Sequence, residues 1–364
     1  QNVSSFSKDV SADSVLATFV GSSQGGFFGA VCATLGVVLP SFIIILIIYS
    51  MLLAIKQDYC RLNSMIIQEL SILIPVYNDE ATLLVKSLHK QAQAISGLCY
   101  EIIVFDDGST NKKTIENNYS LTLLPNCRYI CSEHHDCRAA MRNSLVRQAK
   151  YEWHLMIDAR LILVNNDFLI RYLSCGVRVG EVACGGVCVD GGSLTARLYR
   201  ENLRFRYEKH EESKHSYLKR KADPYKAFRT TNFFYHKSVL KKVPYNEQVK
   251  GYGYEDVLLG KALSEKKIKV THIDNPVAYT EFEENLVYLR KIEEALRTLH
   301  AFEGELNDYS PLLHARNILR KFHLLGAFRK FHALCKGWEL MNLCSNMPSL
   351  FIFKLYKLGY YISL

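Results

Sequence analysis

Two apolar runs that end in polar residues constrain the fold of this chain most strongly. They are SILIPVYND at Ser71–Asp79 and EIIVFDDGST at Glu101–Thr110. An apolar run that stops abruptly at small and acidic residues is typical of a buried parallel strand that ends at the carboxyl edge of a sheet. Ligands of open α/β sheets bind at that edge. Asp106 and Asp107 are therefore predicted to lie beside a ligand, although Asp-Gly is also common in plain turns.

Strand-like and helix-like segments alternate after Ile66. The predicted strands of the first half are Leu70–Val76, Glu101–Phe105, Cys127–Cys131 and Trp153–Ile157. The predicted helices between them are Asp79–Ile95, Lys112–Asn117 and Asp136–Lys150. This alternation predicts an α/β fold with a parallel sheet and right-handed crossovers.

The second half of the chain has a more mixed pattern. Strands are predicted at Val182–Val189, Thr231–Tyr235 and Ile268–Ile273, and helices at Asp256–Lys266 and Asn285–His300. The segment Phe205–Asp223 is dense in charge and has little periodicity, so we predict a loop there.

The N-terminal part contains one long apolar segment. Gly36–Ala54 has no charged residue and is long enough to cross a bilayer. Lys56 and Arg61 follow it, which predicts that the rest of the chain faces the cytoplasm. We expect three parts: a transmembrane segment in residues 1–64, an α/β domain in 65–300 and a basic amphipathic helical tail in 301–364.

The positive charge is concentrated in the tail. The net charge is +9, and residues 316–364 hold eight Lys or Arg against one acid, Glu339. This predicts a local basic surface and argues against a nucleic-acid binder. A helical stripe in the tail is formed by Leu324, Phe328, Phe331, Leu334 and Trp338. It suits either an anionic membrane surface or packing against the preceding domain.

Several motifs, in this order and spacing, resemble the family-2 glycosyltransferases over residues 66–300. They are PVYND, DDGS, RAAMRN at Arg138–Asn143, HLMIDAR at His154–Arg160 and GYGYEDVLLG at Gly251–Gly260. TTNFF, HIDNP and PSLFIFKLYKLGY are similar to those of a bacterial subgroup. The resemblance implies the GT-A fold, which is Rossmann-like and has a mostly parallel central sheet flanked by helices.

The resemblance implies a nucleotide-sugar site. It puts Pro75, Tyr77 and Asn78 beside the nucleotide, and Asp107, together with Asp106, on the uracil ring. A carboxylate there can accept the N–H of the base, which suits a uridine nucleotide. Arg138 and Arg142 lie one helical turn apart and can face the diphosphate, or they can form a solvated basic face.

The resemblance implies that the pair Glu255-Asp256 supplies the catalytic base, as the matching pair does in the family. We favour Asp256, with Glu255 as the second choice. The base would take a proton from the acceptor hydroxyl, and attack opposite the leaving nucleotide would invert the anomeric configuration. An acid at a helix start can also be only a cap or a partner of the helix dipole.

One motif departs from the family pattern. The family has Asp-x-Asp, whose second Asp binds Mn²⁺ or Mg²⁺, and this chain has Asp158-Ala159-Arg160. Tyr279 stands where the subgroup tends to have a histidine near the metal. Three alternatives are open: Arg160 stabilises the diphosphate without a metal, activity is lost, or Asp158 and His272 hold the metal together with the nucleotide.

The N-terminal segment carries a resemblance of its own. Residues Ala17–Ile48, with GAVCATLGVVLPSF, are similar to about one hairpin of a chromate-transporter family protein. One hairpin cannot form a transport path. We expect the residues before about Met65 to be a fusion or gene-prediction remnant.

These features together predict a bacterial glycosyltransferase of polysaccharide biosynthesis. It would move a sugar from a UDP-linked donor to a cell-surface glycan or glycolipid acceptor, at the cytoplasmic face of the inner membrane. Its expected partners are the donor, the acceptor and the membrane surface, with no nucleic acid. The alternative is a catalytically impaired GT-A domain that acts as a binding or scaffold partner in glycan assembly.

Overall fold

The computed structural model describes residues 26–28, 43–51, 67–132 and 136–364. The chain separates into two compact units, Gln1–Ile66 and Ile67–Leu364. In the first unit, residues 26–28 and 43–51 are helical. None of the described helices has both the length and the apolar character needed to cross a bilayer. Residues 36–42 and 52–54 of the predicted transmembrane segment lie outside the described residues, and that segment is not confirmed.

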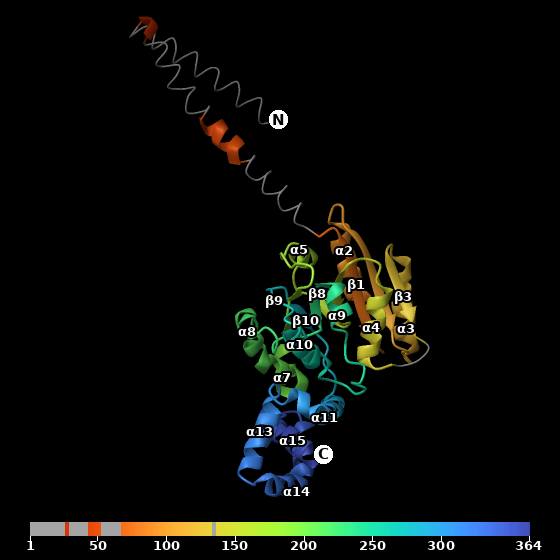
Figure 1. Ribbon diagram of the computed structural model, residues 1–364, viewed down its shortest axis with the longest axis vertical. Helices are drawn as coiled ribbons and strands as arrows, with labels where there is room; N and C mark the ends of the chain where they lie inside the picture. Colours follow the sequence, from red (N-terminus) through yellow and green to blue (C-terminus); the bar gives the residue numbers. More distant parts are fainter. Residues whose placement is uncertain (1–25, 29–42, 52–66, 133–135) are drawn as a thin grey trace. The chain divides into compact units, whose positions relative to one another are not determined.

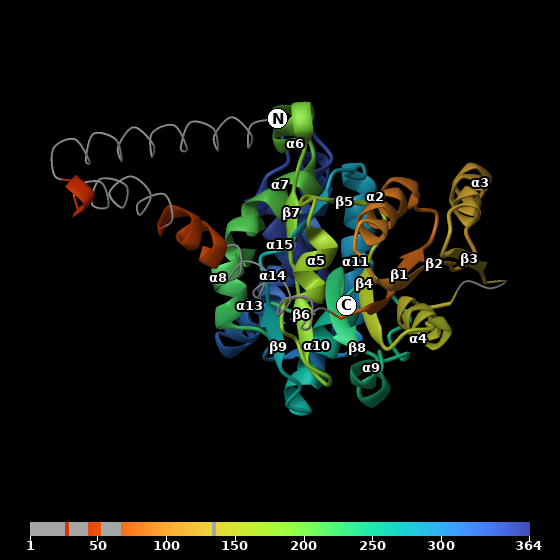
Figure 2. The same cartoon turned by 90° about the horizontal axis from the view of Figure 1, so that it is seen from above.

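A seven-stranded sheet organises the second unit (Figure 1), and Figure 2 shows its strands in the order β3-β2-β1-β4-β8-β6-β9. The strands are β1 (Glu69–Val76), β2 (Cys99–Asp106), β3 (Cys127–Cys131), β4 (Trp153–Ile157), β6 (Val182–Cys184), β8 (Asn232–His236) and β9 (Val270–His272). Strand β8 pairs antiparallel with both of its neighbours, and the other six strands share one direction. The predicted α/β class is confirmed, with a mixed sheet.

Helices cover both faces of the first four strands. Figure 2 shows α2 (Thr82–Gln93) and α3 (Lys112–Tyr119) on one side of β1, β2 and β3, and α4 (Arg138–Gln148) on the other. The short helix η1 (Ser120–Leu123) leads into β3. The chain therefore winds outward from β1 to β3 and returns to β4 on the far side of β1. This reversal makes the gap between the ends of β1 and β4 a topological switch point, where α/β folds bind ligands.

The register of β1 and β2 brings their carboxyl ends to one edge. The two strands pair in parallel over eight residues, and Val76 lies opposite Asp106. Leu73 and Ile103 are fully buried, as is Met156 of the adjacent strand β4. Because the pairing ends at Val76 and Asp106, the polar residues that follow both strands leave the sheet at the same point.

The predicted strand Val182–Val189 is wrong as a single element. It divides into β6 and β7 (Val187–Val189), and β7 belongs to a second, three-stranded sheet with β5 (Leu161–Leu163) and β10 (Val277–Tyr279). Gly186, between the two strands, has a φ of +87°, and a Cβ atom there would lie 2.5 Å from Arg220. A glycine is required at this break, because it permits both the backbone conformation and the close approach.

The predicted loop Phe205–Asp223 is helical. It contains most of α7 (Leu203–Glu212), then η3 (Ser213–His215) and α8 (Tyr217–Ala222). Leu203 and Phe205 are fully buried, whereas most of α7 is polar and at least partly accessible. The buried contacts at one end of α7 thus stabilise a helix that has little apolar periodicity of its own.

Helices complete the rest of the second unit. These are α5 (Phe168–Leu173), η2 (Gly192–Leu194), α6 (Thr195–Glu201), α9 (Ser238–Lys242), α10 (Glu255–Glu265), α11 (Asn285–Ala301), α12 (Glu303–Leu306), α13 (Pro311–Lys321), α14 (Leu325–Leu343) and α15 (Leu350–Ser363). One apolar cluster joins α7, α11, α14 and α15 through Leu203, Tyr288, Leu289, Leu343, Ile352, Phe353 and Tyr356. The C-terminal helices are thereby fixed to the α/β part (Figure 1).

Candidate active site

A hollow lies at the carboxyl ends of β1, β2 and β4, and its empty volume is about 1410 Å³ when space open to solvent is included. One wall comes from the strand ends and from α4. The opposite wall comes from the loop before α10, the end of β10 and helix α11, and it contains Lys250, Gly251, Tyr252, Tyr279, Glu281, Lys291 and Glu294. The hollow therefore sits at the switch point of the sheet, as the strand ends predict.

Most of the predicted binding residues line this hollow. They are Pro75, Tyr77, Asp107, Arg138, Arg142, Asp158 and Arg160. These residues come from four separate stretches of chain. Five other predicted residues are not part of the lining: Asn78, Asp106, Glu255, Asp256 and His272.

Asn78 holds the loop after β1 against the loop after β2. Its Oδ1 accepts hydrogen bonds from the backbone N–H groups of Thr110, at 2.8 Å, and Asn111, at 2.9 Å. Its own N–H donates to the Ser109 hydroxyl at 2.7 Å. Asn78 has a φ of 55°, and asparagine tolerates this left-handed conformation better than most residues. Asn78 therefore positions the two loops instead of facing the hollow.

The two adjacent aspartates have different environments. Asp106 is fully buried, and its carboxylate accepts hydrogen bonds from the Ser109 N–H at 2.7 Å and from the Tyr129 hydroxyl. Because these bonds are internal to the fold, the structure does not bring Asp106 to the hollow, and its predicted place on uracil is corrected. Asp107 lines the hollow, and its Oδ1 accepts a hydrogen bond from the Asp136 N–H at 3.0 Å.

Arg142 links the two halves of the site. Its Nη2 donates to Asp158 Oδ1 at 2.9 Å, and its Nη1 donates to Glu255 Oε1 at 3.1 Å. The side chain is only 3% exposed, so it is not part of a solvated basic face. Burial opposes the charge of Arg142, but the neighbouring carboxylates outweigh it and raise the pKa of the guanidinium. The end of β4 and the start of α10 are thus joined by one charged group.

Arg138 is more accessible than Arg142 and places a second cation beside Glu255. Its guanidinium lies 4.4 Å from the ring centroid of Tyr252, and its Nη1 lies 3.6 Å from Glu255 Oε1. The Nζ of Lys291 lies 6.0 Å from the same ring. The side chain of Arg138 is 44% exposed, so its free donors can reach an anion in the hollow.

Glu255 and Asp256 open helix α10 behind the lining residues. Burial acts to raise the pKa of Glu255, but Arg142 and Arg138 outweigh it and hold that pKa below its ordinary value. Burial and the nearby Glu255 carboxylate raise the pKa of Asp256 to about 6. Tyr254, just before them, has a φ of 65°, a strained conformation that is frequent near functional sites. The pKa values of these two adjacent acids are therefore shifted in opposite directions, which is the usual way to divide acid and base roles.

Arg160 is held by two carboxylates at the hollow. Its Nη1 lies 3.1 Å from Asp79 Oδ1, and its Nε lies 2.9 Å from Glu281 Oε2. In the DAR motif, Asp158 accepts a hydrogen bond from Arg142, and the third residue is the cation Arg160. Within the described residues, no group of three or more His, Cys, Asp or Glu could hold a metal ion. The residues present here do not fit a Mn²⁺ or Mg²⁺ ion.

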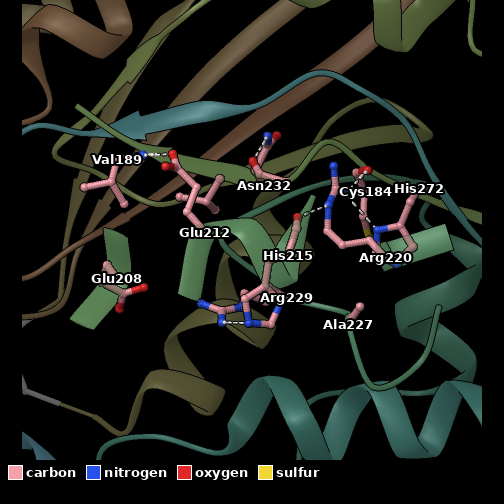
Figure 3. A pocket seen from close by; sticks show the side chains of 12 residues that line it. Cys184, Val189, Glu208, Glu212, His215, Arg220, Ala227, Arg229, Asn232 and His272 are labelled. Atoms are coloured by element: carbon pink, nitrogen blue, oxygen red, sulfur yellow. Dashed lines mark hydrogen bonds between the residues drawn. The ribbon is translucent and has the colours of Figure 1, made fainter. Parts of the chain in front are cut away.

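His272 lies in a different pocket, shown in Figure 3, whose empty volume is about 500 Å³ when space open to solvent is included. Its Nδ1 lies 2.8 Å from Arg220 Nη1, and its Nε2 lies 3.0 Å from the carbonyl oxygen of Pro224. Burial lowers the pKa of His272 to about 4, so the ring is neutral and both nitrogens serve protein partners. The predicted metal pair of Asp158 and His272 is therefore corrected, because no ring nitrogen is left to bind a metal.

Several lining residues were missed in the sequence. Asp79, Tyr252, Glu281, Lys291 and Glu294 line the hollow. Tyr252 lies within the glycine-rich turn GYGYED, a motif that predicts no role for this tyrosine. Lys291 and Glu294 lie on α11, for which the sequence predicts a helix but no site residue. Tyr279 was noted only as a replacement, and it does line the hollow.

Two family models match the chain. Residues 71–167 match the model of glycosyl transferase family 2. The predicted resemblance to the family-2 glycosyltransferases is confirmed by this match. Residues 13–74 match the chromate transporter model, so the second predicted resemblance is confirmed as well. Comparison with curated proteins finds no match.

Solved structures of glycosyltransferases are similar to this chain at low identity. Staphylococcus aureus TarS 1-349 in complex with UDP is 19% identical, with 64% of this chain and 65% of that chain covered and a TM-score of 0.38. The mannosyltransferase PcManGT from Pyrobaculum calidifontis, with GDP-Man and Mn²⁺, is 13% identical, with 81% and 85% covered and a TM-score of 0.47.

A third similar structure is glucosyl-3-phosphoglycerate synthase from Mycobacterium tuberculosis, in complex with Mn²⁺, UDP and glucosyl-3-phosphoglycerate. It is 17% identical, with 64% of this chain and 80% of that chain covered and a TM-score of 0.40. The chain thus spans slightly less than two thirds of the length of TarS 1-349, at 65%.

Proposed function

We propose that this glycosyltransferase moves a sugar from a UDP-linked donor to a hydroxyl group of a cell-surface glycan or glycolipid, with inversion, at the cytoplasmic face of a bacterial inner membrane. The observation that carries the proposal is the convergence of Asp107, Asp158, Arg138 and Arg160 on one hollow at the switch point of the sheet. In the proposed complex, the Asp107 carboxylate accepts the N–H of the uracil ring.

The proposed donor site uses arginine and lysine to bind the diphosphate. The lining contains six basic residues, Arg138, Arg142, Arg160, Arg204, Lys250 and Lys291, and six acidic ones, Asp79, Asp107, Asp136, Asp158, Glu281 and Glu294. Arg160 is paired with two of these acids, and its remaining donors are proposed to bind phosphate oxygens, as a guanidinium can do bidentately. A metal ion has no role in the proposed mechanism, because the described side chains do not fit one.

Asp256 is the proposed base. Its carboxylate takes the proton of the acceptor hydroxyl while that oxygen bonds to the anomeric carbon, and the bond from this carbon to the UDP oxygen breaks. The electron pair of the broken bond leaves with UDP, whose added negative charge is balanced by Arg138 and Arg160. A pKa of about 6 leaves Asp256 deprotonated at neutral pH and still basic enough to accept a proton.

The test combines nucleotide binding with turnover. Calorimetric titration with UDP and GDP, in EDTA and then in Mn²⁺, is expected to show binding of UDP in EDTA and weaker binding of GDP. UDP release from UDP-sugars in the presence of a lipid or glycan extract then measures transfer. Equal affinity for UDP and GDP would contradict the role of Asp107. UDP binding without any release of UDP would favour the scaffold alternative.

A further inference from the structure

Helix α14 presents an apolar face that the rest of the second unit, over its described residues, leaves uncovered. Phe331, Leu334, Trp338 and Met341 are 46%, 87%, 55% and 67% exposed, respectively. Their spacing of three, four and three residues places them on one side of the helix. We call these four residues the outer stripe.

The opposite side of α14 is firmly attached to the protein. His332 and Glu339 are 3% and 1% exposed, and His332 Nδ1 lies 2.7 Å from Glu339 Oε2. The His332 ring lies against Tyr356 of α15, with the ring centroids 5.7 Å apart. Leu343 is fully buried in the cluster shared with α11 and α15. The outer stripe is thus held on a fixed helix at one end of this unit, where Figure 1 shows α14 along the edge.

The C-terminal helices, which include the outer stripe, carry mostly positive charge. Residues 316–364 contain eight Lys or Arg and one acidic side chain, and that acid is the buried Glu339. Exposed cations lie on α14 and on the adjoining helices, namely Arg320, Lys321, Arg329, Lys330, Lys336 and Lys354. Phe322 and Phe351, which flank α14 in sequence, are 64% and 69% exposed.

We propose that the outer stripe of α14 inserts into the surface of a bilayer that contains anionic phospholipids. Apolar side chains that include a tryptophan, combined with nearby cations, match the boundary between acyl chains and negative headgroups. A second copy of the chain fits this face poorly, because it would bring the same positive charge against it. Lipid binding by α14 is independent of the proposed transfer reaction.

The test uses Trp338 in the full-length chain. The sequence has two tryptophans, Trp153 and Trp338, so the substitution Trp153→Phe leaves the reporter on α14 alone. Vesicles of phosphatidylcholine with phosphatidylglycerol, carrying brominated acyl chains, are expected to shift the Trp338 emission to the blue and to quench it. Phosphatidylcholine vesicles alone, or high salt, are expected to weaken the effect about tenfold, since cations attract anionic headgroups.

Paired substitutions separate α14 from other lipid contacts, including any made by the N-terminal segment. Leu334→Glu with Met341→Glu is expected to lower vesicle partitioning measured by Trp338 quenching about tenfold or more. Leu218→Glu on α8, where the native side chain is 74% exposed, is the matched control and is expected to change nothing. UDP affinity is expected to stay the same in Trp153→Phe, in the double variant Leu334→Glu with Met341→Glu, and in Leu218→Glu. Three results would each overturn the proposal. The first is unchanged Trp338 emission while the protein sediments with vesicles, and the second is equal quenching in neutral and anionic vesicles. The third is concentration-dependent self-association that buries Trp338 without lipid.

Discussion

Arg160 and Asp79 form an ion pair across the mouth of the hollow, with Nη1 and Oδ1 at 3.1 Å. Asp79 follows β1 and Arg160 follows β4, so the pair joins the two strand ends that define the switch point. Arg160 adopts a left-handed conformation, with a φ of 57°, which is uncommon outside glycine and asparagine. A cation is therefore held, against some backbone strain, at the position where the resembled family has a metal-binding aspartate.

Arg160→Ala is expected to weaken UDP binding about tenfold to hundredfold, since a charge-assisted hydrogen bond contributes about 1.5–3 kcal/mol. Calorimetric titration with UDP in EDTA measures this directly. Arg171→Ala is the control, because Arg171 forms an exposed ion pair with Asp167 on α5. A UDP affinity that is the same in both variants would remove Arg160 from the donor site.

Arg160→Asp is expected to create a response to Mn²⁺. The substitution replaces the cation with a carboxylate beside Asp79 and Glu281, in the same motif as Asp158, and carboxylate oxygens are good ligands for this ion. The melting temperature of the variant is expected to rise with Mn²⁺ and to rise further when UDP is added. The wild-type protein, which lacks that ligand set, serves as the comparison, and an equal Mn²⁺ effect on both proteins would contradict the prediction.

Asp256→Asn is expected to lower kcat about 10²- to 10⁴-fold while UDP affinity stays within about twofold, because the amide cannot accept the acceptor proton. Steady-state transfer kinetics measure kcat, and titration with UDP measures the affinity. Glu255→Gln serves as the comparison. Since Glu255 is held by Arg142 and Arg138, its loss should disturb both stability and UDP binding. If Asp256→Asn retained wild-type kcat, Asp256 could not be the base.

The pH dependence of stability gives an independent test of Asp256. Its pKa is raised to about 6, so the folded state binds this proton more tightly than the unfolded state does. Between about pH 4 and pH 6 the folded state therefore loses stability as pH rises. Asp256→Asn removes this effect, so its melting temperature should exceed that of the wild type at pH 7 by more than at pH 4. In the wild-type enzyme, the same titration should make kcat fall as pH drops below about 6.

The sequence predicted the first half of the fold well, for a physical reason. Strands β1, β2 and β4 are buried on both faces, so their apolar runs are nearly continuous and their ends are marked by acids. The β-α-β order then determines the edge at which Asp107 and Asp158 meet. Helix α7 was missed because its stability comes from tertiary contacts of Leu203 and Phe205, which no local pattern reveals.

The limits of motif reasoning are clearest at Asp106 and His272. Both residues are of the right chemical type and lie close in sequence to residues that line the hollow. Their polar atoms are already engaged, by Ser109 and Tyr129 for Asp106 and by Arg220 and Pro224 for His272. Tyr129, Arg220 and Pro224 each lie more than twenty residues from the residue they bond, and a single sequence does not identify such partners. For the tail, the sequence left two alternatives open, an anionic membrane surface or packing against the preceding domain. Helix α15 packs on the domain, whereas α14 exposes its outer stripe.

Arg142 is expected to be the most sensitive structural residue of the site. Arg142→Met leaves Glu255, which is 8% exposed, and Asp158 without their shared cation, and breaking a buried pair in this way costs about 3–5 kcal/mol. Urea unfolding measures the loss, and Arg147→Met is the control, since Arg147 is an exposed residue of the same helix. Adding Asp158→Asn and Glu255→Gln to Arg142→Met should recover much of the stability, because no uncompensated charge is then buried. A triple variant as unstable as Arg142→Met alone would show that the packing of the arginine, and not its charge, holds β4 to α10.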